Sequence, residues 1–371
     1  MSHIVIDGRM LGWTGIGRYT RSLLEELERI DSNNRYTVLV QRQDWERWAP
    51  TRPNFERLET NIPPYSFGEQ WRLPWVLYRQ RADLVHFLNF NSPLLYLKKR
   101  VVTIHDLTLL DFKNYRGSGW LKLVYELKYR AMRLVFWRAV RGATRVITDV
   151  HYNRELLATR GYAPTAKTTA IPLGMPDLPA APSGTASSYP KPYLLYVGNL
   201  YPYKNLVGVV EALPQLLRLH PNLRFVIVGK EDVFSAGLRQ RARELKVGTA
   251  VVFTGFVSDA ELAAYYHGAV AYVFPSLSEG FGLPGLEAMG YGLPVAAADA
   301  SCLPEVYGDA AVYFDPHSPA DIARVVGDLL NNSRQRTALK ARGLAHVKTF
   351  SWQRMATQTL AVYQQALKPR R

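Results

Sequence analysis

The sequence has little cysteine and no long hydrophobic segment. Its 371 residues include one cysteine, Cys302, which excludes an internal disulfide and suits a reducing compartment. It has no run of about 18 apolar residues of the kind that a membrane-spanning helix needs. The chain begins directly with a predicted strand, without the basic and apolar segments of an export signal. We therefore expect a cytoplasmic protein.

Acidic residues are also scarce. Asp and Glu number 31 against 46 Lys and Arg, so the formal net charge is +15. An excess of this size is typical of proteins that meet nucleic acid, anionic lipid or phosphorylated substrates. The basic residues are scattered along the chain, however, and no nucleic-acid recognition motif accompanies them. We therefore expect no nucleic-acid partner.

Short β-branched runs alternate with longer helical patterns along the chain. Early examples are Val101–Ile104 and Arg145–Thr148, and later ones are Tyr193–Val197 and Phe225–Val228. This alternation predicts parallel sheets covered by helices. In the second half, strands are expected near 193–198, 224–228, 251–254, 271–274, 294–298 and 311–314.

One segment between the two halves, 172–192, is rich in Pro, Ser, Ala and Gly and has the composition of a linker. A helical pattern near the end of the chain comes too late to be needed by the second sheet. The sequence therefore predicts a domain at 1–175, a linker at 176–192, a second domain at 193–350, and a helix at 351–371 that crosses back to the first domain.

A glycine cluster, Gly12-Trp13-Thr14-Gly15-Ile16-Gly17, lies between the first strand and a helix. Glycines there let the backbone approach a phosphate, and the start of a helix favours negative charge. A dinucleotide site would need a third glycine in the pattern G-x-G-x-x-G and an acid after the second strand, and both are missing. This excludes a dehydrogenase and leaves a phosphate-binding turn or a plain tight turn.

Two further candidates follow predicted strands. His105 comes directly after Val101–Ile104, and Lys204 follows Tyr193–Val197 through a turn that contains proline. Ligands of open α/β sheets gather at the carboxyl ends of strands. Histidine can donate a hydrogen bond and titrates near neutrality, and a lysine can neutralise a departing pyrophosphate. A chance His-Asp pair and a solvated lysine are the alternatives.

The segment from Glu279 to Glu287 is the most specific. Gly280 and Gly282 free the loop backbone, and Pro284 is placed at the first position of a short helix, so loop amides can face an anion. Glu287 would repel phosphate but suits ribose hydroxyls. Glu279 can accept from sugar hydroxyls or balance positive charge on an anomeric carbon. Helix capping by Glu287 and a solvated Glu279 are the alternatives.

The stretch from Lys113 to Arg145 interleaves basic residues with aromatic ones such as Trp120 and Tyr125. This composition suits a helix on a membrane surface. At 100° per residue, the apolar and basic positions overlap instead of separating into two faces. The sequence thus predicts peripheral contact of this region with the cytoplasmic face of an anionic inner membrane.

In order and spacing, these motifs resemble the family 4 glycosyltransferases of the GT-B fold, and the resemblance covers nearly the whole chain. It implies an α/β protein with two Rossmann-like domains, whose parallel sheets face each other across a cleft. The donor nucleotide would lie mainly in the second domain. It also implies a retaining transfer from a nucleotide-sugar donor, with no cofactor, no essential metal and no protein nucleophile.

The resemblance also implies roles for the residues of the second domain. Glu287 would bind the ribose. Glu279, with the backbone amides of Phe281, Gly282 and Leu283, would hold the donor sugar and phosphates.

The remaining implied roles concern the pyrophosphate and the sugar. Lys204 would hold the pyrophosphate, with Gly15 and Gly17 closing on it, and His105 would contact the transferred sugar. Asn199, also placed in the donor site, stands where the family often has a basic residue, which puts more of the charge neutralisation on Lys204.

A second departure from the family lies in the first domain. Asp149 stands after the strand that ends at Thr148, where a serine is common. This leaves the first-domain contacts around the acceptor open.

The donor and acceptor follow from a narrower resemblance, to bacterial mannosyl- and rhamnosyltransferases of cell-surface polysaccharide assembly, through Thr14–Tyr19 and Tyr196–Asn199. It favours GDP-mannose, with UDP- or dTDP-sugars as alternatives. The acceptor would be a glycan or a lipid-diphosphate-linked oligosaccharide, which also suits the positive net charge. A nucleotide-sugar epimerase and a non-catalytic nucleotide-sugar-binding module remain as rivals.

Overall fold

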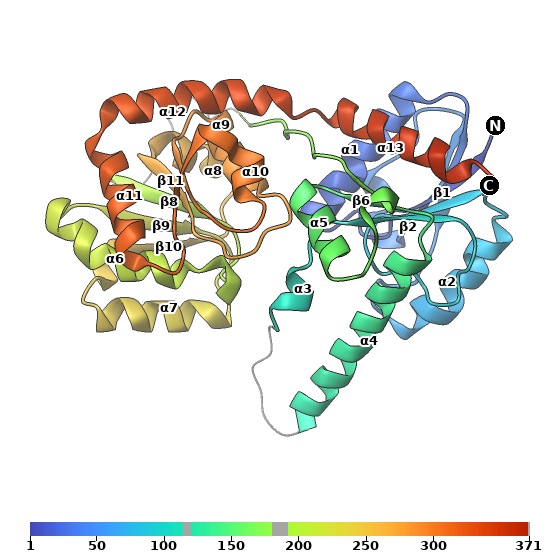
Figure 1. Cartoon of the computed structure of the whole chain (residues 1–371), viewed down its shortest axis with the longest axis horizontal. Coiled ribbons are helices and arrows are strands. Elements are labelled where there is room, and N and C mark those ends of the chain that lie inside the picture. The colour runs from blue at the N-terminus through green and yellow to red at the C-terminus, as the bar shows by residue number, and fades with distance from the viewer. Residues whose placement is uncertain (114–119, 180–191, 370–371) are drawn as a thin grey trace. The chain divides into compact units, whose positions relative to one another are not determined.

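The computed structural model describes residues 1–113, 120–179 and 192–369 (Figure 1). The chain divides into two compact units, one formed by Met1–Gly174 with Ser351–Arg371 and the other by Met175–Phe350. Most of the expected linker, residues 180–191, lies outside the described residues. The first unit is therefore built from both ends of the chain.

The first unit contains a parallel sheet in the order β3-β2-β1-β4-β5-β6-β7. Its strands are β1 (His3–Asp7), β2 (Arg35–Val40), β3 (Phe55–Glu59), β4 (Leu84–Phe87), β5 (Arg100–Ile104), β6 (Arg145–Thr148) and β7 (Thr168–Ala170). The three central residues of β1, Ile4 to Ile6, are apolar and fully buried, because a parallel sheet is covered on both faces. The strand order reverses between β1 and β4, which is where such sheets bind ligands.

Helices surround this sheet, and the last of them comes from the far end of the chain. They are α1 (Gly15–Ile30), η1 (Arg42–Arg47), α2 (Phe67–Arg79), α3 (Thr108–Asp111), α4 (Trp120–Gly142), α5 (His151–Thr159), η2 (Thr165–Lys167) and α13 (Trp352–Leu367). Helix α13 packs against α1 and against strands β4, β5 and β6 (Figure 1).

A buried polar chain attaches α13 to the sheet. The Nδ1 atom of His86 lies 2.6 Å from the Tyr363 hydroxyl, and its Nε2 atom lies 2.8 Å from the Thr103 hydroxyl. Burial lowers the pKa of His86 to about 3, so the ring is neutral. Both ring nitrogens have partners, as a buried imidazole requires. The carboxyl-terminal helix is thereby an integral part of the first unit.

The second unit contains a parallel sheet in the order β10-β9-β8-β11-β12-β13. Its strands are β8 (Tyr193–Val197), β9 (Arg224–Val228), β10 (Val251–Gly255), β11 (Ala271–Phe274), β12 (Val295–Ala298) and β13 (Ala311–Phe314). The order again reverses beside the first strand of the unit, between β8 and β11.

The helices of the second unit connect these strands and cover the sheet. They are η3 (Pro202–Lys204), α6 (Leu206–Leu219), α7 (Val233–Glu244), η4 (Gly248–Ala250), α8 (Asp259–Gly268), α9 (Leu283–Gly290), α10 (Leu303–Tyr307), η5 (Gly308–Ala310), α11 (Pro319–Asn331), α12 (Ser333–His346) and η6 (Val347–Thr349). Helix α9 begins at Leu283, so Pro284 occupies its second position instead of the expected first.

The expectation of two Rossmann-like α/β domains with parallel sheets is confirmed by these two strand orders. Within the described ranges, no helix is both long enough and apolar enough to cross a membrane. Even the longest, α4, carries too many charged residues for that.

Candidate active site

An ion pair joins the two loops at the strand reversal of the second sheet. Lys204 ends η3, in the loop after β8, and Glu279 lies in the loop after β11. The Nζ atom of Lys204 donates to Oε1 of Glu279 at 2.6 Å. The two side chains are only 13% and 11% exposed. Because β8 and β11 are the strands between which the order reverses, the pair lies where a ligand is expected.

Backbone contacts hold the Glu279 loop in place. The Ser301 hydroxyl accepts from the Glu279 amide at 3.1 Å and donates to the Glu279 carbonyl at 3.0 Å. Ser301 adopts a φ of 57°, which is uncommon outside glycine. The amide of Leu277 also donates to the carbonyl of Tyr203 at 2.8 Å, which joins this loop to the one that carries Lys204.

The glycine-rich part of the loop is fixed by side chains that point into the protein. Gly282, at the start of α9, has a φ of 90°, and its carbonyl accepts from the Tyr307 hydroxyl at 2.6 Å. A Cβ at Gly285 would lie 2.2 Å from the same hydroxyl. The buried ring of Phe281 packs edge-on against Phe350, with centroids 5.7 Å apart. First-turn amides lack acceptors within their helix and attract anions, so this rigid turn can bind phosphate.

Glu287 lies one turn into α9, beside two tyrosines. The Tyr266 hydroxyl donates to its Oε2 atom at 3.4 Å, a long hydrogen bond. Burial raises the pKa of the Tyr266 phenol well above its ordinary value, so this hydroxyl stays a donor. The Tyr266 ring stacks on Tyr291 at 4.9 Å. The carboxylate of Glu287 is half-buried beside these rings, with oxygen lone pairs that suit ribose hydroxyls.

Asn199 lies in the exposed turn after β8. Its carbonyl accepts from the Tyr196 hydroxyl at 2.8 Å, so the backbone of this turn is anchored to the strand. The side chain of Asn199 carries no charge, and Lys204 is the nearby cation of the loop. The donor roles inferred for Asn199, Glu287 and the amides of Phe281 to Leu283 stay predictions.

In the first unit, His105 lies between two hydrogen-bond acceptors. Its Nδ1 atom lies 2.9 Å from Oδ2 of Asp149, and its Nε2 atom lies 3.0 Å from the carbonyl of Leu88. Tyr19 packs edge-on against the ring at 4.8 Å. Burial by itself lowers the pKa of His105, but the Asp149 carboxylate outweighs it and raises the pKa above its ordinary value.

This arrangement favours the imidazolium, because only the doubly protonated ring can donate to both acceptors. The aspartate found in place of the usual serine therefore serves as the counter-ion of His105. A direct hydrogen bond from His105 to a sugar would have to displace the Leu88 carbonyl or the Asp149 carboxylate. Contact between His105 and the transferred sugar stays a prediction.

The two glycines predicted to close on pyrophosphate differ in their surroundings. A Cβ at Gly15 would meet no atom within 4 Å, so its backbone faces open space. A Cβ at Gly17 would lie 2.4 Å from the Leu11 carbonyl. Gly17 therefore lets α1 pack closely on the preceding loop, which is a structural reason for glycine at that position.

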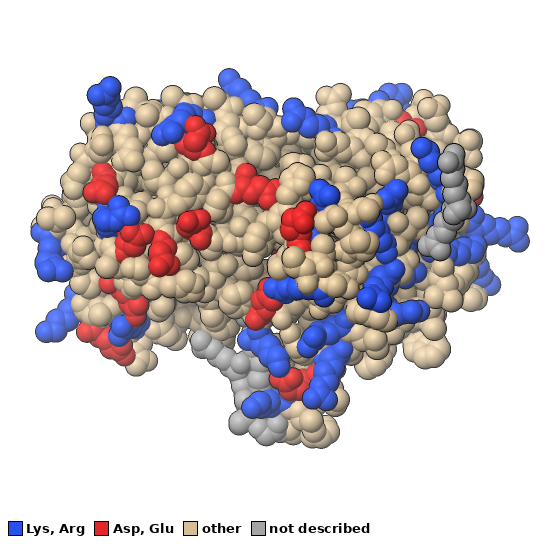
Figure 2. All heavy atoms as spheres, in the orientation of Figure 1, with Lys and Arg blue, Asp and Glu red and all other residues tan. Residues whose placement is uncertain are grey.

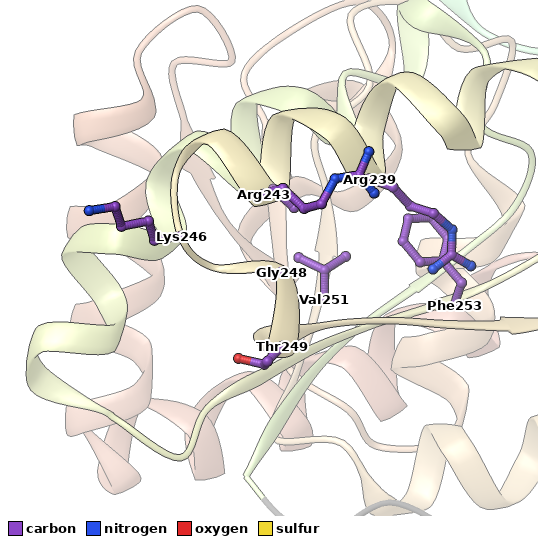
Figure 3. A pocket seen from close by; sticks show the side chains of 8 residues that line it. Arg239, Arg243, Lys246, Gly248, Thr249, Val251 and Phe253 are labelled. Atoms are coloured by element: carbon purple, nitrogen blue, oxygen red, sulfur yellow. The ribbon is translucent and has the colours of Figure 1, made fainter.

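The second unit also has a basic hollow of about 430 Å³ (Figure 3). Its lining includes Arg239, Arg243, Lys246, Val251 and Phe253. The Arg239 guanidinium lies 4.0 Å from the centre of the Phe253 ring and pairs with Glu231 at 2.9 Å. The hollow lies at the amino end of the edge strand β10, whereas Lys204 and Glu279 follow carboxyl ends. The hollow and the Lys204–Glu279 pair thus lie at opposite ends of the sheet.

Two family models match the chain and together span most of it. "Glycosyl transferase 4-like domain" matches residues 14–174, and "Glycosyl transferases group 1" matches residues 183–346. The first match falls within the first structural unit and the second match within the second.

Individual proteins are similar as well. The O-antigen chain mannosyltransferase B of Escherichia coli is 28% identical over 94% of this chain and 96% of its own length. The serotype-specific mannosyltransferase WbdA of Escherichia coli is 34% identical over 44% of this chain but only 21% of that longer protein. The structure of sucrose-phosphate synthase from Thermosynechococcus elongatus matches with a TM-score of 0.72 at 20% identity, covering 98% of this chain and 99% of that one. At that identity, the likeness concerns the fold alone.

The charge of His105 can be tested by substituting its partner. In Asp149→Asn, the carboxylate that contributes most to raising the pKa of His105 is lost while burial and the Asp106 carboxylate remain, so this pKa is expected to fall. Histidine side-chain NMR titration of the wild type and the variant measures this directly. Asp111→Asn, which removes the surface partner of Arg160, is the matched control.

The raised pKa also sets a pH dependence for folding. The stabilisation that His105 contributes is full below about pH 6.5 and is lost as the pH rises through the folded-state pKa. A His105 pKa that does not change in Asp149→Asn would contradict this account.

Proposed function

Because the chain belongs to the family 4 glycosyltransferases of the GT-B fold, we propose that it transfers mannose from GDP-mannose, with retention of configuration, to a glycan or a lipid-linked oligosaccharide. The choice of mannose is supported by the mannosyltransferase of Escherichia coli that matches over 94% of this chain. UDP- and dTDP-sugars are the alternative donors. The observation that carries the proposal is the Lys204–Glu279 pair at the strand reversal of the second sheet.

The second unit supplies the charge that a departing nucleoside diphosphate needs. An ammonium group has three N–H donors, so Lys204 can hold Glu279 and a phosphate oxygen at the same time. The amides at the start of α9 add fixed positive dipoles. We infer that these groups together neutralise the diphosphate without an essential metal ion, and that Glu287 accepts hydrogen bonds from the ribose.

The reaction exchanges one bond of the anomeric carbon for another. The bond from this carbon to the diphosphate oxygen breaks, and a bond to the acceptor hydroxyl oxygen forms. Positive charge grows on the anomeric carbon in between, and the Glu279 carboxylate stabilises it. The hydroxyl proton passes to the departing phosphate oxygen, so no protein nucleophile is required. We infer that the first unit binds the acceptor, with the His105 cation at the carboxyl edge of its sheet.

A thermal-shift panel tests the donor. GDP-mannose is expected to raise the unfolding temperature more than UDP-glucose, UDP-galactose or dTDP-rhamnose at equal concentration. A ligand at about one hundred times its dissociation constant stabilises the native state by roughly 2.7 kcal/mol. A larger shift with a uridine or thymidine donor would show that GDP-mannose is the wrong donor. If no donor shifted the unfolding temperature, the donor-site assignment would be wrong.

Peripheral membrane contact is a second proposal, and helix α4 supports it. Trp120, Leu121 and Leu127 on α4 are 72%, 67% and 55% exposed. Lysines and arginines gather over the part of the molecule that holds α4 (Figure 2). Its acidic residue, Glu126, pairs with Lys113 at 2.9 Å. Residues 114–119 of the expected region lie outside the described residues. Exposed apolar side chains among basic ones suit an anionic membrane surface.

Sedimentation with vesicles that contain anionic lipid tests this contact. Lys122→Glu is expected to weaken binding roughly thirtyfold at low salt, because each basic residue near the surface contributes about 1 kcal/mol and charge reversal doubles the change. Arg334→Glu on α12 changes the net charge equally and should bind like the wild type. Equal weakening by both variants would indicate a net-charge effect and contradict a role for α4.

A further inference from the structure

The first unit has a hollow of about 370 Å³ that the donor chemistry does not use. It lies between the start of α2 and the middle of α4. Its apolar walls are Tyr65, Phe67, Phe90, Ala131, Met132 and Val135. Its polar lining residues are Ser66, Glu69, Gln70, Asn91 and Lys128. The hollow is thus a mainly apolar space with a cation on one side.

The Glu69 carboxylate at the base of the hollow is already satisfied by the protein. Oε1 of Glu69 accepts from Arg9 at 2.6 Å and from Asn91 at 2.5 Å. Its Oε2 atom accepts from the Tyr65 amide at 2.9 Å. The Arg9 guanidinium also pairs with Asp7 at 2.7 Å, so one cation serves two buried carboxylates. A buried network of this kind is costly to break.

The chemistry of the walls therefore selects the ligand. A sugar that entered the hollow would place many of its hydroxyls against apolar walls, which costs free energy. A hydrocarbon chain needs only apolar contact, and each buried methylene contributes about 0.8 kcal/mol. The hollow is thus better suited to a hydrocarbon chain than to a carbohydrate.

An exposed aromatic stripe continues from the hollow along α2. Phe67, Trp71 and Trp75 are 91%, 72% and 57% exposed. Their spacing of four residues places them on one face of the helix. Phe67 belongs both to the wall of the hollow and to this stripe. An apolar surface of this kind on a protein marks an interaction site.

Lys128 supplies the complementary charge. It is exposed on α4, one turn from Ala131 and Met132, so a chain in the hollow could place a phosphate beside its ammonium group. We propose that the hollow between α2 and α4 binds the isoprenoid chain of a lipid phosphate next to its head group, with Lys128 at the phosphate. This inference rests on the proposed function, in which the acceptor is carried on a lipid diphosphate.

Calorimetric titration of the full chain with farnesyl phosphate tests the proposal without any transfer assay. Excess inorganic diphosphate is included so that Lys204 is occupied. Ala131→Trp fills the mouth of the hollow with a large ring and is expected to weaken binding at least tenfold. Leu134→Trp places the same ring on α4 outside the lining and should bind within twofold of the wild type.

Lys128→Gln tests the contact with the phosphate separately from the contact with the hydrocarbon chain. It is expected to weaken farnesyl phosphate severalfold and to leave the affinity for farnesol unchanged. Thermal unfolding of each variant shows whether it is folded before binding is compared. If Lys128→Gln weakens neither ligand, the phosphate position is overturned.

Two outcomes would contradict binding in the hollow. If Ala131→Trp bound farnesyl phosphate like the wild type, the hollow would not be the binding site. If Leu134→Trp weakened binding equally, the chain would lie on the outer surface of α4. Failure of the proposed function would look different. Nucleotide sugars would then not stabilise the protein, whereas the farnesyl phosphate titrations would give the same result.

Discussion

The ion pair between Lys204 and Glu279 is the constraint on which the donor site depends. The two side chains are mostly buried, so removing one partner would leave the other charge poorly solvated and without its counter-ion. The pair therefore holds the loop after β8 against the loop after β11. The anchoring of Glu279 by Ser301 and of the next turn by Tyr307 then fixes where the amides of α9 point. The chemistry proposed for the second unit follows from this one contact between two strand ends.

Much of the second sheet was predictable, because parallel strands covered on both faces are short, continuous apolar runs. The runs at 193–197, 224–228 and 271–274 appear as β8, β9 and β11. The start of α9 was also predictable from its glycines and proline. Helix α7 begins at Val233, because the Asp232 side chain caps it by accepting from the Phe234 amide at 2.8 Å. An aspartate before a helix is a capping signal that the sequence itself carries.

Other parts of the sites could not be predicted from one sequence. Ser301 and Tyr307 reach the Glu279 loop from more than 20 residues away, and no local pattern marks them. The pairing of Asp149 with His105 could have been predicted. His105 follows β5 and Asp149 follows β6, and because these strands are parallel neighbours, their carboxyl ends lie at the same edge of the sheet. The four-residue spacing of Phe67, Trp71 and Trp75 is visible in the sequence, but such a stripe is normally buried. Only the structure shows that this one faces outward.

In this account, Lys204 gives the second unit its affinity for a diphosphate. Calorimetric titration with GDP and with GMP tests this most directly, and UDP and UMP are titrated in parallel. The wild type should bind the nucleoside diphosphate of its donor more tightly than the corresponding monophosphate. In Lys204→Met that preference should fall by about tenfold or more, because a charge-assisted hydrogen bond contributes roughly 1.5–3 kcal/mol. Affinity for the monophosphate should fall by a smaller factor, because it has no second phosphate for Lys204 to bind. A Lys204→Met variant that keeps the full preference for the diphosphate would contradict the account.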